Sequence, residues 1–165
     1  MARKVFFSFH YQPDNWRVSQ VRNIGVIEGN QPAKDNDWET VVDGGDTQIK
    51  QWISSQMDGR TCTVILAGQD TANRKWINHE IVQSWDKGKG VVVIYIHNLK
   101  NSQGVQSNKG QNPLDYVTHG LTGKKLSEIA KAYDPPYSTS QFVYEYIQDN
   151  IDSWIEEAIK IRNAN

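Results

Sequence analysis

Two residues at helical spacing, Trp76 and Glu80, have side chains that could act together in a reaction. Residues four apart on a helix lie side by side. A carboxylate beside an aromatic ring suits cleavage of an N-glycosidic bond, because the carboxylate stabilises or captures the positive charge that develops on the ribose. The departing flat base gains from stacking on the ring. The plainer interpretation is an ordinary amphipathic helix, with Glu80 solvated and Trp76 in the core.

The segment before these residues predicts how they are positioned. Residues 61–67 form a β-branched and apolar run that is typical of a strand buried on both faces, and Gly68 ends it. A helix then starts where a parallel strand ends, which is the edge of an open α/β sheet where ligands bind. The candidate N-cap residues of this helix are Asp70, Thr71 and Asn73. The side of the helix that is expected to face the sheet carries Ile77, Ile81, Ser84 and Trp85.

The N-terminal run KVFFSF, Lys4 to Phe9, predicts the central first strand of a doubly wound sheet. Ser8, Phe9, His10 and Tyr11 fall at its carboxyl end, so they are candidates to line a ligand site. The alternation of the strand favours the core for Phe9. Ser8, His10 and Tyr11 are expected to be better placed to face a ligand.

The remaining pattern predicts the order of the other elements. A helix is expected over Asp14–Val21 with Asp14 as its cap, a long loop over 23–37 and a short strand over 38–42. Arg17 and Arg22 are interpreted as surface charges of the first helix. A helix capped by Asp46, a central strand over 91–96, an edge strand or helical turn within 124–133 and a last helix through 147–159 follow. This order predicts a flavodoxin-like α/β fold, a three-layer sandwich whose mostly parallel sheet has helices on both faces.

Length and composition bound the alternatives. The 165 residues are expected to form a single domain, 1–165, with a formal charge of −1 and therefore no basic excess for binding nucleic acid. No apolar run is long enough to span a membrane, and the N-terminus lacks the features of a signal peptide. The single cysteine, Cys62, lies in a predicted strand and fits a reducing, cytoplasmic setting.

Several functions that are common for this architecture require residues that this sequence lacks. Strand one is not followed by the acidic cluster of a phosphoacceptor domain or by a flavin phosphate loop, and no Gly-x-Gly-x-x-Gly or Gly-x-Ser-x-Gly motif occurs. No metal site is predicted, since the histidines lack ligand spacing; they are His10, His79, His97 and His119.

The sequence resembles a known family. KVFFSFHY, the triplet Val21-Arg22-Asn23 and the run TANRKWINHEIVQSWDKGK are similar to the TIR-like proteins of the ThsB type, from the Thoeris antiviral defence system of bacteria. The resemblance extends to Ile96-His97 and to the turn over 112–116. It does not extend to residues 23–45, where the usual BB-loop signature of TIR domains is absent, so no role is assigned there.

The resemblance implies an enzyme that breaks NAD at the nicotinamide–ribose bond and joins the ADP-ribose to itself as a cyclic isomer. NAD is the substrate, and no cofactor is implied. The product would activate an effector of the ThsA type, and TIR enzymes often need assembly into homo-oligomers. The family's catalytic glutamate falls on Glu80, its helix tryptophan on Trp76, and its substrate-binding strand end on Ser8, Phe9, His10 and Tyr11.

Two other functions stay open at this point. The chain could be a non-catalytic TIR-like interaction module, or a transferase that processes nucleosides by the same carboxylate chemistry. Burial of Glu80 beside His10 and Trp76 in a pocket would favour the enzyme, whereas an exposed Glu80 with no concavity would favour the interaction module.

Overall fold

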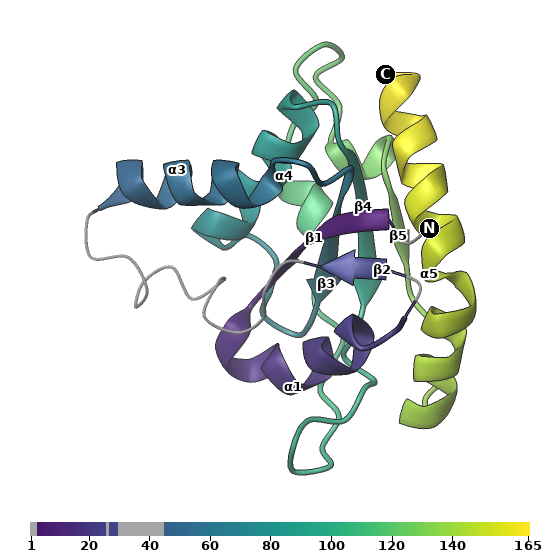
Figure 1. Cartoon of the computed structure of the whole chain (residues 1–165). Coiled ribbons are helices and arrows are strands. Elements are labelled where there is room, and N and C mark those ends of the chain that lie inside the picture. The colour runs from purple at the N-terminus through teal and green to yellow at the C-terminus, as the bar shows by residue number, and fades with distance from the viewer. Residues whose placement is uncertain (1–2, 26, 30–44) are drawn as a thin grey trace.

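A fully parallel sheet forms the centre of the fold (Figure 1). The computed structural model describes residues 3–25, 27–29 and 45–165. In these residues the sheet has five strands in the order β2-β1-β3-β4-β5, which is the flavodoxin-like order. The predicted fold class is therefore confirmed. The strands are β1 Arg3–Phe9, β2 Ile27–Gly29, β3 Cys62–Ala67, β4 Gly90–Tyr95 and β5 Lys131–Tyr133.

Helices cover both faces of this sheet, which confirms the three-layer arrangement. In Figure 1, α3 and α4 lie to the left of the sheet and α5 lies to its right. α1 packs with α5 in one core, while α3 and α4 pack on the opposite face. The helices are α1 Tyr11–Arg22, α3 Asp46–Met57, α4 Lys75–Asp86 and α5 Ser140–Asn163, with short 3-10 turns η2 Pro113–Tyr116 and η3 Leu126–Glu128.

The alternation of side chains along β1 explains the two cores. Val5, Phe7 and Phe9 point into the core shared with α1 and α5, whereas Phe6 points into the core of α3 and α4. β3 and β4 are buried at every position, as expected for central strands of a parallel sheet. Ser8 therefore faces the layer of α3 and α4.

The register brings three strand ends to one edge. Phe9 pairs with Leu66, and Leu66 pairs with Ile94, so β1, β3 and β4 end at nearly the same level. The segments that begin at His10, Gly68 and Ile96 consequently leave the sheet side by side.

The second strand lies where the sequence predicted a loop. β2 pairs in parallel with β1 through Arg3↔Ile27, Lys4↔Glu28 and Val5↔Gly29. The loop prediction is therefore wrong at 27–29, because three residues carry too short a pattern to indicate an edge strand. The strand predicted at 38–42 lies outside the described residues.

The start of α1 also differs from the prediction. α1 begins at Tyr11 with His10 at the N-cap, so Asp14 is not the cap. Pro13 falls in the first turn, where a missing N–H costs no helical hydrogen bond. The Asp14 carboxylate instead accepts a hydrogen bond from Arg17.

The start of α4 differs as well. Arg74 is the N-cap residue, and none of the three predicted caps occupies that position. Thr71 Oγ1 accepts a hydrogen bond from Gly68 N at 2.8 Å, so its side chain closes the turn after β3. The predicted sheet-facing side of α4 is confirmed, since Ile77, Ile81, Ser84 and Trp85 are all buried.

The C-terminal third follows the sequence pattern closely. The ambiguous segment 124–133 contains both a helical turn, η3, and an edge strand, β5, which pairs in parallel with β4. The last helix is confirmed as α5, with Ile147, Ile151 and Ile155 fully buried. Earlier in the chain, the prediction that Asp46 caps α3 is wrong, because Gly45 is the N-cap residue and Asp46 lies in the first turn of the helix.

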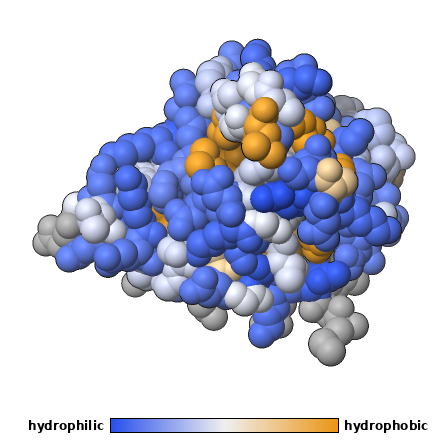
Figure 2. Space-filling model, turned by 90° about the horizontal axis from the view of Figure 1, so that it is seen from above, coloured by the Kyte–Doolittle hydropathy of each residue, from blue (hydrophilic) through white to orange (hydrophobic). Residues whose placement is uncertain are grey.

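The surface is polar, as the composition predicts. The face seen in Figure 2 is mostly hydrophilic, with hydrophobic side chains gathered in one area. In the described ranges, none of the helices has the length and apolar character that crossing a membrane requires.

Candidate active site

Glu80 is completely buried between α4 and the sheet. Its exposed fraction is 0%, and Ser8 Oγ donates a hydrogen bond to Glu80 Oε1 at 2.5 Å. Ser8 reaches it because β1 alternates, which turns Ser8 toward the α4 layer, two residues after Phe6 on the same side. The interpretation of Glu80 as a solvated helix carboxylate is therefore wrong. A buried carboxylate requires hydrogen-bond partners, and Ser8 is one of them.

Trp76 lies one turn before Glu80 and packs where α3 meets α4. Its side chain is 8% exposed and belongs to the cluster that contains Phe6 and Ile53. The Lys75 ammonium sits 4.9 Å from the centre of the indole and also pairs with Asp46 on α3 at 2.5 Å. Trp76 therefore packs between α3 and α4, the helix that carries Glu80.

Of the other residues predicted at the end of β1, Phe9 and Tyr11 lie on the face of the sheet opposite Ser8. Phe9 is 2% exposed and packs in the core of α1 and α5, and Tyr11 packs against that same core, with ring centres 6.4 Å apart. His10 is half-buried and is the N-cap residue of α1. The structure thus brings Ser8 to Glu80, and it places Phe9 on the opposite side of the sheet.

A buried ion pair that the sequence analysis missed supports the same edge. Arg17 is 4% exposed, so its interpretation as a surface charge is wrong. Its guanidinium donates to Asp14 Oδ1 at 3.0 Å, to the Leu99 carbonyl at 2.8 Å and to the Val105 carbonyl at 2.9 Å. These bonds tie α1 to the segment that follows β4. The acid–base spacing of Asp14 and Arg17, three apart on a helix, was the available signal.

The Asp14 carboxylate also fixes the distance between α1 and the end of β3. A Cβ atom on Gly68 would lie 2.0 Å from Asp14 Oδ2, so only glycine fits there. Burial raises the pKa of Asp14 above its ordinary value, and the guanidinium of Arg17 opposes that shift. This contact packs the segments that leave β1 and β3 closely together.

Two imidazoles, the buried His97 and the half-buried His79, lie near these elements. His97 follows β4, is 7% exposed and contacts the Tyr95 ring edge-on at 6.1 Å. His79 contacts Trp76 edge-on at 5.6 Å. Burial lowers the pKa of each imidazole below its ordinary value, which favours the neutral form at neutral pH.

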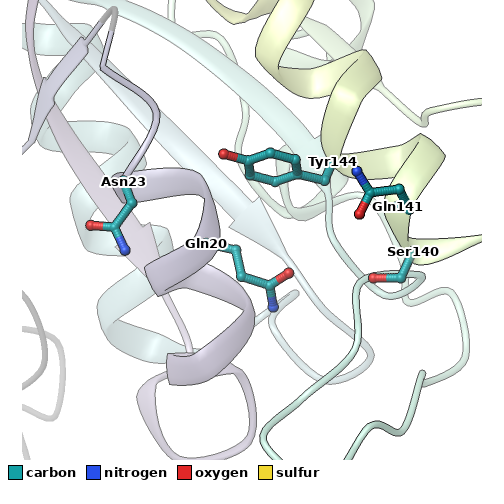
Figure 3. Close-up of a pocket in the computed structure, with 5 residues that line it drawn as sticks. All are labelled: Gln20, Asn23, Ser140, Gln141 and Tyr144. Carbon is teal, nitrogen blue, oxygen red and sulfur yellow. The ribbon is translucent and has the colours of Figure 1, made fainter.

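The described cavities lie away from Glu80. One of about 310 Å³ opens between α1 and α5, and Figure 3 shows that Gln20 and Asn23 come from the α1 side while the other lining residues belong to α5. None of the predicted site residues lines it. Neither of the two described cavities is lined by Glu80.

The comparisons with known proteins agree with the fold. Residues 6–101 match the family model described as "Thoeris protein ThsB, TIR-like domain". A Bacillus cereus (strain MSX-D12) protein named "Putative cyclic ADP-D-ribose synthase ThsB1" is 37% identical over 133 residues, which are 76% of this chain and 69% of that relative. The matched range includes Ser8, Trp76 and Glu80. The chain therefore belongs to the Thoeris ThsB family of TIR-like proteins.

Proposed function

We propose that this protein cleaves NAD at the nicotinamide–ribose bond, with Glu80 as the catalytic carboxylate, and closes the ADP-ribose into a cyclic isomer. The observation that carries the proposal is the burial of Glu80 beside Ser8, on the helix that follows β3. Membership of the ThsB family supports it, and so does the relative named for cyclic ADP-D-ribose synthesis.

The chemistry needs a negative charge beneath the ribose. The C–N bond breaks with its electron pair going to nicotinamide, which leaves as a neutral molecule because its ring nitrogen was cationic. The positive charge that develops on the ribose is stabilised by Glu80, or captured by it as an ester. A nucleophile elsewhere on the same ADP-ribose then attacks that carbon and loses its proton, and no water is consumed.

Ser8 would act as a positioning residue for Glu80. Its hydrogen bond holds one carboxylate oxygen in a fixed direction, and the complete burial of Glu80 lowers the local dielectric. In such surroundings a carboxylate attracts a developing cation more strongly than it does in water. His10, at the N-cap of α1, follows Ser8 by two residues and is half-buried, so part of its side chain is exposed to a substrate.

The burial of Glu80 also implies a regulated site. With 0% of its surface exposed, Glu80 cannot touch NAD until the elements around it separate. We include in the proposal that assembly of the protein into a homo-oligomer opens the site. The cyclic product would then be the signal that activates an effector of the ThsA type.

A second candidate function is a non-catalytic interaction module: the burial of Glu80 favours the enzyme, but neither described cavity reaches Glu80, which favours the module. In that case the Ser8–Glu80 pair would be a buried polar contact that stabilises the fold. The two functions differ in what Glu80→Gln does, since glutamine keeps the size of the side chain and an acceptor for Ser8 but removes the charge.

The test is nicotinamide release from NAD by the purified protein, measured over a range of protein concentrations. The matched control is Asp86→Asn, which removes a carboxylate from an exposed position on the same helix. The proposal predicts release that rises more steeply than protein concentration, is kept by Asp86→Asn and is lost in a folded Glu80→Gln variant. Equal release by the parent and Glu80→Gln would contradict it.

A further inference from the structure

A second cavity, of about 270 Å³, lies beside the first turns of α5 and has aromatic walls. Four of its lining residues lie on one stripe of the helix, at spacings of three, four and seven, and the fifth comes from the segment before it. They are Phe142, Glu145, Tyr146 and Asp149, and Tyr137. We call these five residues the aromatic cage. Glu80 and Ser8 are not among them.

The three aromatic rings are steeply inclined to one another and are not stacked in parallel. The Tyr137 ring centre lies 5.9 Å from that of Phe142 at 61°, and 5.8 Å from that of Tyr146 at 64°. Phe142 is 52% exposed and Tyr137 is 45% exposed. Such exposure of two neighbouring aromatic residues leaves an apolar surface open to solvent, which marks binding sites more often than chance exposure does.

Hydrogen bonds and a ring contact hold the residues of the aromatic cage in place. Asn98 Nδ2 donates to the Tyr137 carbonyl at 3.1 Å, and Gln106 Nε2 donates to the neighbouring Ser138 carbonyl at 2.6 Å. The Tyr146 ring contacts Trp154, whose exposure is only 7%. A ligand would therefore meet walls that are already ordered, which reduces the entropy lost on binding.

The open side of the aromatic cage carries unbalanced negative charge. Glu145 accepts a hydrogen bond from the Gln141 side-chain amide at 3.0 Å, which leaves its charge in place. Over the described ranges, neither Glu145 nor Asp149 takes part in a salt bridge.

We propose that the aromatic cage binds an organic cation of the alkylated ammonium class, such as a quaternary or methylated ammonium group. The faces of aromatic rings attract cations, and an alkylated ammonium sheds its water at low cost and fills an apolar cavity. The two carboxylates add long-range attraction. A neutral apolar ligand would make no use of these charges. The cation could be a free small molecule or a methylated lysine of a partner protein, which present the same chemistry.

The experiment is a titration of the full chain, without NAD, followed by NMR chemical shifts and calorimetry. The probes are choline and its uncharged isostere 3,3-dimethylbutan-1-ol, and a short peptide with or without a trimethylated lysine. Phe142→Ala removes a ring that is half-exposed, and the pair Glu145→Gln with Asp149→Asn removes the charge. Trp16→Ala, at an exposed ring on α1, and Asp152→Asn, outside the cage on α5, are the matched controls.

The proposal predicts shifts centred on the aromatic cage, with choline or the trimethylated peptide bound more tightly than its uncharged or unmethylated counterpart. Phe142→Ala should weaken that binding by about two- to fivefold, and the control variants should leave it unchanged. The charge-removing pair should weaken binding most at low salt. A tighter methylated peptide assigns the source to a partner protein, and a tighter choline assigns it to a small molecule. Equal binding of choline and its isostere, or no shift with any probe, would overturn the proposal.

Discussion

Ser8 on β1 donates a hydrogen bond of 2.5 Å to Glu80 on α4, across 72 positions of sequence. Neither residue is exposed, so this bond joins the central strand to the proposed catalytic carboxylate inside the protein. Because Glu80 reaches its place only when β1 and α4 pack correctly, the site and the fold depend on the same contact.

Replacing Ser8 by alanine should therefore lower both stability and activity. A buried acceptor that loses its donor costs about 1–3 kcal/mol, and we expect a loss of this size in the free energy of unfolding. Urea unfolding of Ser8→Ala, Glu80→Leu and the double variant measures it as a cycle. If Ser8→Ala costs as much in the Glu80→Leu protein as in the parent, the two side chains are not coupled, contrary to this prediction.

The contact between Gly68 and Asp14 gives a second prediction. A methyl group at Gly68 would overlap the Asp14 carboxylate, so Gly68→Ala should destabilise the protein by about 1–3 kcal/mol. Gly25→Ala is the control, because a Cβ there meets nothing within 4 Å. Thermal and urea unfolding would show the difference. A Gly68→Ala protein as stable as the Gly25→Ala protein would refute the overlap.

The Arg17 ion pair gives a third prediction. Arg17→Met keeps much of the side-chain volume but leaves Asp14 buried without its charged partner, and we expect a loss of about 3–5 kcal/mol. It also removes the hydrogen bonds to the Leu99 and Val105 carbonyls. Hydrogen exchange of residues 99–105 should then become faster than in the parent. Unchanged exchange in that segment would show that Arg17 does not hold it.

The imidazoles of His79 and His97 give a fourth prediction, on how stability depends on pH. Burial lowers the pKa of His79 and His97 in the folded protein, whereas the unfolded chain titrates near 6.5. Below about pH 6.5 the unfolded state therefore binds more protons, and the free energy of unfolding falls as the pH falls. Burial raises the pKa of Asp14 in the folded protein, which makes the free energy of unfolding rise as the pH falls. This effect is confined to acidic pH, upward from the ordinary pKa of 3.8.

Urea midpoints at about pH 7.5 and about pH 5.5 measure this dependence. His97→Gln should show a smaller drop in midpoint between the two values than the parent does. The neighbouring Asp134, Lys109 and Arg17 are kept in that variant, so their contributions cancel in the comparison. An equal or larger drop in His97→Gln would contradict the assignment of part of the dependence to His97.

The elements with long patterns were predictable from the sequence. β3, β4 and α5 follow from continuous apolar runs or from helical periodicity, because each buries enough residues to show its pattern. β2 was not predictable, since three residues at a sheet edge carry almost no signal. The start of α1 was misplaced because Asp14, a good cap by type, is used in an ion pair instead.

The site was predictable only in part, for a related reason. The spacing of Trp76 and Glu80 and the family resemblance identified the helix, and strand alternation placed Ser8 on its side of the sheet. Sequence alone could not show that Glu80 has no exposed surface, because that depends on how β1 and α4 pack. The burial of Arg17 was missed since it depends on the loop after β4 folding back over α1.

The central claim is that Glu80 performs the glycosidic chemistry, and the most direct measurement is the mass of the nucleotide product. Lysates from phage-infected cells that express the parent or Glu80→Gln would be analysed by mass spectrometry after equal expression is verified. The account predicts a product at the mass of ADP-ribose minus water in the parent and its absence in Glu80→Gln. The same product in both, or its absence in both, would contradict the account.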